Sequence, residues 1–378
     1  MTLEQKGTNN VPTNQELNAN LVKQFSHLEQ LIHQAANSGT PATTTTAVKI
    51  DLTGEPSHLP KALFLGDIPL VSKGELCTIV ALPSSGKSNV CEGIVAAYAR
   101  AKGFEPLDAL NFVYPAENST SDRKVLWVDT ERTPNDILWS VKRLKNRCNV
   151  TAAELSTYLD FYSFAEIAAA NDALTTLKIL VGSGLYDMVI LDGIFDFCPD
   201  INHIEKATQV VKELRAMAVK HDVSIVTTIH PNKGTDTIAG HLGAMLYRFS
   251  RAILYIEKLP NGIRRLTNEI GQGKLSYSSE PANSTFIWSD ASGMFIVCDA
   301  PDTTTATNYD ITIVDSIFAG ATTIASSTFK SEYIAKTGLS KKRVDALCLQ
   351  MQSDEILKRS GVTTNTIYTL LSSETIPF

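Results

Sequence analysis

Residues Ile79–Ser88 read IVALPSSGKS, and this stretch decides the fold of the chain. An apolar segment that favours a β-strand leads into a short loop of small residues, which ends in Gly-Lys-Ser. A run that favours a helix follows, with Val90, Ile94 and Val95 at helical spacing. A strand, a glycine-containing loop and a helix in this order are typical of a loop that holds phosphate groups.

The backbone N–H groups of such a loop point at the oxygens of a polyphosphate, although Pro83 has none to offer. We expect the Lys87 ammonium to reach the β- and γ-phosphates and the Ser88 hydroxyl to hold Mg²⁺. Ala81 stands where the usual pattern begins with Gly, which the turn tolerates if φ stays negative. The alternative is an ordinary Gly/Ser turn. The candidate nucleotide-binding residues are Ser84, Ser85, Gly86, Lys87, Ser88 and Asn89.

Composition and charge limit the class of protein. The chain has 378 residues, 43% hydrophobic and 20% charged, which is typical of a globular protein. It has no run of about 18 apolar residues, and its polar start resembles no signal peptide, so we expect no membrane association. The six cysteines form no CxxC pair, which favours reduced thiols in a cytoplasmic protein. With a net charge of −6, any binding to nucleic acid must use local basic patches.

Three regions differ in composition. Residues 1–46 contain an amphipathic helix at about 15–35 and a Thr-rich linker; the helix would dock on its own core or on a neighbouring subunit. Residues 47–300 alternate strand and helix signals, which predicts an α/β domain with a mostly parallel sheet. Its late strands follow one another closely and predict an antiparallel extension. Residues 309–378 form a third region. The predicted strands are 75–81, 124–129, 159–163, 187–192, 223–229, 250–257, 263–269 and a hairpin at 285–298.

Polar residues follow three of these strands, and carboxyl ends of parallel strands share one edge of a sheet. Asp192 ends an apolar strand and is the candidate partner of Mg²⁺ together with Ser88. Glu131, which follows the strand 124–129, is the candidate to activate water, although Asp129 and Glu131 could instead cap the next helix. His230 could sense the γ-phosphate or serve as a structural hydrogen-bonding group. The catalytic candidates are therefore Lys87, Glu131, Asp192 and His230.

The order of these motifs resembles the RecA-type P-loop ATPases, and within them the RepA-like helicases and ATPases of plasmids and mobile elements. The resemblance covers about residues 50–298. It implies a RecA-like core that binds ATP and Mg²⁺, single-stranded DNA at core loops that include Lys233, and a homo-oligomer such as a hexamer. It also implies a basic finger donated by a neighbouring subunit. In related helicases this finger is a Lys-x-Arg-like pair after a late strand, and only Lys274 is present at the matching place here. Other candidates for the donated cation are Arg251, Arg248, Arg264 and Arg265.

The last region resembles a winged-helix domain. Residues 330–338 would form one helix, closed by Gly338, and a helix from Lys341 to about Met351 would follow. Lys341, Lys342 and Arg343 begin that helix and suit contact with duplex DNA. The alternative is a winged helix used for protein contact.

Two functions follow from these expectations. The first is a DNA-associated ATPase, of the kind found in RepA-like helicases, that acts in replication or mobilisation of a plasmid or mobile element. The second is an ATP-switched regulator that binds DNA without unwinding it. A small-molecule kinase fits less well, because no acceptor pocket is apparent and the sheet continues past the Asp192 strand.

Overall fold

The computed structural model describes residues 59–119, 122–232, 237–299, 309–337, 341–353, 356–361 and 366–371. The helix expected at 15–35 lies outside these residues. The chain separates into two compact units, residues 1–299 and 300–378. None of the helices in the described segments is both long and apolar enough to cross a membrane.

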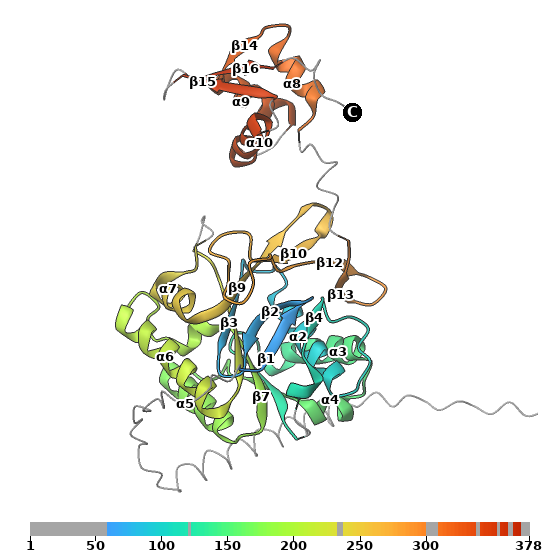
Figure 1. Cartoon of the computed structure of the whole chain (residues 1–378), viewed down its shortest axis with the longest axis vertical. Helices are drawn as coiled ribbons and strands as arrows, with labels where there is room; N and C mark the ends of the chain where they lie inside the picture. Colours follow the sequence, from blue (N-terminus) through green and yellow to red (C-terminus); the bar gives the residue numbers. More distant parts are fainter. Residues whose placement is uncertain are drawn as a thin grey trace, which may run out of the picture. The chain divides into compact units, whose positions relative to one another are not determined.

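A parallel sheet forms the centre of the first unit (Figure 1). Six neighbouring strands run in the same direction. In spatial order they are β9 (Ser250–Lys258), β3 (Leu76–Ala81), β8 (Ser224–Ile229), β7 (Tyr186–Asp192), β5 (Lys124–Asp129) and β6 (Leu159–Ser163). The predicted α/β class with a mostly parallel sheet is confirmed.

Four further strands extend this sheet beyond β9. Strand β10 (Arg264–Thr267) pairs antiparallel with β9 and with β12 (Asn283–Ser289), which pairs with β13 (Met294–Val297). Strand β11 (Lys274–Leu275) also pairs antiparallel with β9. The expected antiparallel extension and the hairpin near 285–298 are therefore confirmed.

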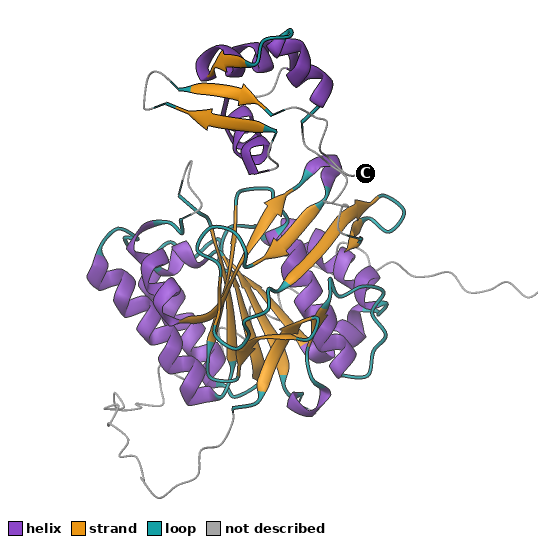
Figure 2. Ribbon diagram, turned by 45° about the horizontal axis from the view of Figure 1, so that its top comes forward, coloured by secondary structure: helices purple, strands orange, loops and turns teal. Residues whose placement is uncertain are grey.

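Helices cover both faces of the parallel strands (Figure 2). Strand β3 is buried along its whole length, and its side chains alternate between two apolar clusters: Ile79 joins one and Val80 the other. The first cluster includes residues of α2 (Lys87–Ala101), α3 (Pro134–Cys148) and α4 (Ala152–Tyr158). The second includes residues of α5 (Ala170–Gly182), α6 (Ile204–His221) and α7 (Gly240–Phe249).

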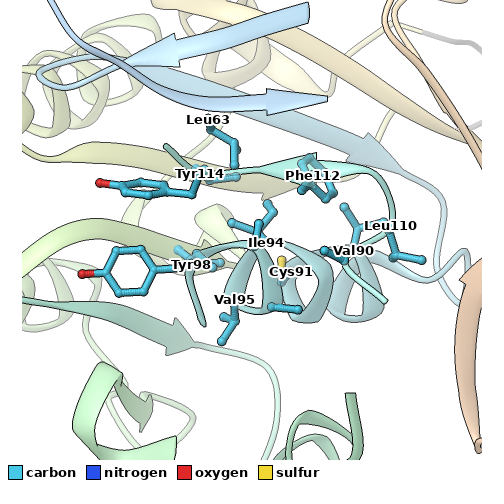
Figure 3. Packing of buried hydrophobic residues seen from close by; sticks show 14 of the residues in the cluster. Leu63, Val90, Cys91, Ile94, Val95, Tyr98, Leu110, Phe112 and Tyr114 are labelled. Carbon is cyan, nitrogen blue, oxygen red and sulfur yellow. The ribbon is translucent and has the colours of Figure 1, made fainter. Parts of the chain in front are cut away.

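A small second sheet packs beside α2. It consists of β1 (Lys61–Leu65), β2 (Ile68–Ser72) and β4 (Phe112–Val113), all paired antiparallel. Apolar side chains of α2 meet those of this sheet and of the loop around β4 (Figure 3). The sequence reasoning missed this sheet, because β4 has only two residues and pairs with a strand far away in the chain.

The second unit combines three helices with an antiparallel sheet in the order β14-β16-β15. A buried core that includes Phe329, Tyr333, Leu347 and Tyr368 holds the helices and the sheet together. Along the chain the elements are α8 (Ile311–Phe318), β14 (Thr323–Ala325), α9 (Ser326–Thr337), α10 (Lys341–Ser353), β15 (Leu357–Ser360) and β16 (Ile367–Leu370).

Helix α9 begins earlier than the sequence predicted. The expected helix started near Lys330, whereas α9 starts at Ser326, directly after β14. Its buried residue Phe329 contacts the aromatic rings of Phe318 and Tyr368. These long-range contacts stabilise an extra turn at the start of α9 that the local sequence did not indicate. Gly338, expected to close this helix, lies outside the described residues.

A buried ion pair lies at the amino end of the parallel strands, away from the loop that follows β3. Lys73 Nζ donates a hydrogen bond of 3.1 Å to Asp187 Oδ1, and the two side chains are 8% and 0% exposed. Tyr98 donates from its hydroxyl to Asp187 Oδ2 at 2.9 Å. The pair connects the segment before β3 with β7 and α2, so it helps to set how these elements pack.

We expect Asp187→Ala to destabilise the first unit by about 3–5 kcal/mol, because it leaves the Lys73 ammonium buried without its partner. The measurement is the free energy of unfolding from urea denaturation. Lys178→Ala is the matched control, since Lys178 pairs with Glu213 at a partly exposed site and its loss should cost less than about 1 kcal/mol. Equal losses in the two variants would contradict the prediction.

Candidate active site

The loop between β3 and α2 has the backbone that the sequence predicted for phosphate binding. Gly86 precedes the first residue of α2 and has φ 100°, a left-handed conformation that favours glycine. No side chain caps α2 at this end, so its first backbone N–H groups are available to a ligand. The ring of Phe295, on β13, lies 3.7 Å from where a Cβ on Gly86 would stand. The loop is thus supported by the antiparallel extension of the sheet.

A cavity of about 400 Å³ opens beside this loop. It gathers most of the predicted residues, although they come from four separate parts of the chain. Among the predicted nucleotide-binding and catalytic residues, only Ser85 does not line the cavity, and it is 1% exposed. The lining residues are Pro83, Ser84, Gly86, Lys87, Ser88, Asn89, Asp129, Glu131, Arg132, Arg143, Asp192 and His230.

Ser88 and Asp192 meet at the predicted metal position. Ser88 Oγ donates a hydrogen bond of 2.7 Å to Asp192 Oδ2. Asp192 Oδ1 accepts a second bond of 2.9 Å from the hydroxyl of Thr228, near the end of β8. Since β8 lies between β3 and β7, Thr228 is placed to orient the carboxylate. The sequence reasoning missed Thr228, whose only signal is its position two residues before His230.

Lys87 lies against His230 and close to carboxylates. Its Nζ is 3.1 Å from both ring nitrogens of His230, whose Nδ1 donates to the Ala81 carbonyl at 2.8 Å. Burial lowers the pKa of Lys87, while Glu131 and Asp192 act in the opposite direction. His230 Nε2 lies 3.7 Å from Glu131 Oε1, and the Glu131 side chain is half exposed. A carboxylate with this access can hold a water molecule at the cavity.

Asp129 has a different role from Glu131. Its Oδ1 accepts the backbone N–H groups of Glu131 and Arg132, at 3.0 and 2.8 Å. Its Oδ2 accepts Arg132 Nε at 2.6 Å. Burial raises the pKa of Asp129, and Arg132 opposes that rise. Helix α3 is capped instead by Thr133, which accepts from the N–H of Asp136. Neither Asp129 nor Glu131 caps the helix, so Asp129 fixes the turn that presents Glu131.

The residues present fit a magnesium ion and a nucleotide. Hydroxyl and carboxylate oxygens, as on Ser88 and Asp192, are ligands that Mg²⁺ prefers. Among the described residues, two residues that line the cavity each have a buried polar atom without a hydrogen-bond partner: Asn89 Oδ1 and Arg132 Nη2. Buried polar groups are normally satisfied, so partners from a polar ligand are expected here.

The finger candidates lie outside this cavity. Arg251 donates from Nε to Glu75 Oε1 at 2.8 Å near the start of β9, and Lys274 donates to the Tyr247 carbonyl at 3.1 Å. Neither residue lines the cavity of its own chain. Lys233 lies outside the described residues, and the side chains of Lys341, Lys342 and Arg343 are likewise not described.

Comparison with known proteins assigns the family. A model of the AAA domain matches residues 43–236, a little over half of the chain, and the match contains the loop, Glu131, Asp192 and His230. The chain belongs to the AAA domain family. No curated protein matches it. The crystal structure of the RadB recombinase is similar over 60% of this chain and 92% of its own, with 15% sequence identity and a TM-score of 0.40.

In this AAA domain we expect Lys87→Ala to reduce the affinity for ATP at least about tenfold, because the cavity loses the cation that follows Gly86 in the loop, and a lysine at this place typically binds phosphate. Binding of a fluorescent ATP analogue in the presence of Mg²⁺ measures the effect. Lys258→Ala is the matched control, since Lys258 donates to the Pro83 carbonyl but does not line the cavity. Unchanged affinity in Lys87→Ala would remove the basis of the site assignment.

Proposed function

We propose that the protein is a RecA-type ATPase that hydrolyses ATP in association with DNA. The observation that carries the proposal is the meeting of Lys87, Ser88, Glu131 and Asp192 around one cavity at the carboxyl edge of the sheet. Phosphate-binding, metal-supporting and water-orienting groups are the three parts that this chemistry needs.

Each of these residues has a defined task in the proposed reaction. The loop 83–88 and Lys87 bind and orient the triphosphate, and Lys87 offsets the charge that develops on the γ-phosphoryl group. Ser88 and Asp192 would hold Mg²⁺, which supplies further charge neutralisation. Glu131 orients a water molecule for in-line attack and accepts its proton. His230, in contact with Lys87 and near Glu131, responds to the presence of the γ-phosphate.

Association with DNA is proposed from three features. One is the RepA-like order of motifs, with Lys233, which follows β8 in the sequence, as a candidate for binding single strands. Another is the element order of the second unit, helix-strand-helix-helix-strand-strand, which favours the winged-helix interpretation. The last is the run Lys341, Lys342 and Arg343 at the start of α10, which suits duplex DNA.

Assembly into a ring or filament is part of the proposal, since ATPases of this type complete their sites with a neighbouring subunit. Lys274 and Arg251 are the candidates for the donated cation. Both are held by partners in their own chain, Tyr247 and Glu75. This favours, as second candidate, an ATP-switched DNA-binding regulator with slow turnover and no unwinding. Helicase action on a plasmid or mobile element is the more specific form of the first candidate.

We expect Glu131→Gln to bind ATP as the wild type does but to lower the turnover number about 100-fold or more, because the amide cannot accept the proton of the attacking water. Binding of a fluorescent analogue and steady-state phosphate release are measured on the same preparation. Asp136→Asn is a suitable control, since Asp136 lies in the nearby first turn of α3 and does not line the cavity. Loss of ATP binding in Glu131→Gln would show that the residue is structural.

Steady-state ATP hydrolysis with and without DNA separates the two candidate functions. If the protein is a helicase, single-stranded DNA is expected to stimulate ATP hydrolysis about tenfold or more, because a helicase couples turnover to the strand that it holds. If the protein is an ATP-switched regulator, we expect slow ATP hydrolysis that single-stranded DNA does not change, together with binding to duplex DNA. Absence of both hydrolysis and DNA binding would contradict the proposal.

A further inference from the structure

Two arginines line the cavity besides Lys87, and the proposed reaction does not use the position of one of them, Arg132. Arg132 follows Glu131 directly, and its guanidinium lies between two carboxylates from neighbouring strands. Its Nε donates to Asp129 Oδ2 at 2.6 Å, and its Nη2 lies 3.7 Å from Asp192 Oδ2. Asp129 and Asp192 are direct partners in the pairing of β5 with β7, so the sheet itself holds these two side chains together.

Two hydrogen bonds fix the guanidinium in this place, and a third holds the backbone of Arg132. Besides Asp129, Nη1 donates to Ser140 Oγ at 2.6 Å, and Ser140 is fully buried on α3. Ser163, on β6, donates to the Arg132 backbone carbonyl at 2.7 Å. The remaining nitrogen, Nη2, is buried and has no hydrogen-bond partner. Two nitrogens thus anchor the group, and the third faces the carboxylate that would support the metal.

The electrostatics of the site agree with this geometry. Burial alone would lower the pKa of Arg132, but Asp129 and Asp192 outweigh it and the pKa is raised. The arginine therefore stays charged in a partly buried position, with a side chain 24% exposed. A fixed positive charge there stabilises two carboxylates that would otherwise repel each other.

We propose that Arg132 is a positioning residue that takes the place of a divalent cation beside Asp192 until the metal arrives with the nucleotide. The inference rests on the proposed function, because it concerns how the same site acquires Mg²⁺. A free divalent cation is repelled by the guanidinium, whereas the complex of Mg²⁺ with ATP is a net anion and is attracted by it. The free protein consequently excludes the metal and accepts it as the nucleotide complex.

Binding of Mn²⁺ in the absence of nucleotide tests this proposal, with electron paramagnetic resonance of the free ion as the readout. The wild type is expected to bind Mn²⁺ weakly in the absence of nucleotide. Arg132→Gln is expected to bind free Mn²⁺ at least about tenfold more tightly, because the repelling charge within 4 Å of Asp192 is gone. In Arg132→Gln combined with Asp192→Asn this gain should disappear.

Arg143→Gln is the matched control for a lost cation in the same cavity. Arg143 also lines the cavity and donates to Ser140, but it pairs with Glu92 and not with Asp192. The affinity of the Arg143→Gln variant for free Mn²⁺ should stay within about twofold of the wild type, because the charge of Arg143 is paired with Glu92. Far-ultraviolet circular dichroism and thermal melting establish that each variant is folded.

Two results would overturn the proposal. One is firm binding of Mn²⁺ to the wild type without nucleotide. This measurement uses only the wild-type protein, so it tests the proposal even if Arg132→Gln fails to fold. The other is a folded Arg132→Gln whose affinity for free Mn²⁺ equals that of the wild type. In either case ATP binding by the wild type would leave the proposed function intact. Absence of ATP binding by the wild type would instead count against the proposed function.

Discussion

The site depends on the register of two parallel strands that end at the same edge of the sheet. The pairing of β5 with β7 places Asp129 opposite Asp192, and the hydrogen-bond ladder of two neighbouring strands fixes that register. A slip by one residue would turn every side chain of a fully buried strand to the other face, so the packed helices on both sides hold the register as well. Two carboxylates are thereby brought together at the carboxyl edge of the sheet.

Buried carboxylates have different kinds of partners at the two ends of the parallel sheet. At the amino end, Asp187 is fully buried and is met by Lys73 and the Tyr98 hydroxyl. At the carboxyl end, Arg132, Ser88 and Thr228 donate hydrogen bonds to the two carboxylates, while Asn89 Oδ1 and Arg132 Nη2 are buried without a hydrogen-bond partner in the described part of the chain. The first arrangement needs nothing from outside and stabilises the fold. The second has the pattern of a site prepared for a polar ligand, which is the physical basis for placing the nucleotide there.

Local sequence predicted the long, strongly patterned elements well. Strands such as 124–129 and 187–192 were predicted to within one residue, because a buried strand must be continuously apolar and its ends are marked by polar residues. The short sheet of β1, β2 and β4 was missed, and α9 was predicted too short. In both cases the deciding contacts are distant in the chain: β4 pairs with β1, and Phe329 packs on Tyr368. The candidate residues Lys87, Ser88, Glu131, Asp192 and His230 were named from motif order, and the fold brings them to one cavity.

The sequence alone determined the phosphate loop, the class of fold and the acidic strand ends, because each depends on residues that are close together in the chain. Only the tertiary structure decided which neighbours those residues acquire. Thr228 reaches Asp192 because β8 lies between the strands of the loop and of Asp192. Arg132 stands between Asp129 and Asp192 because strands distant in sequence are paired in register. Such contacts arise from strand order and register, and no local pattern encodes either of them.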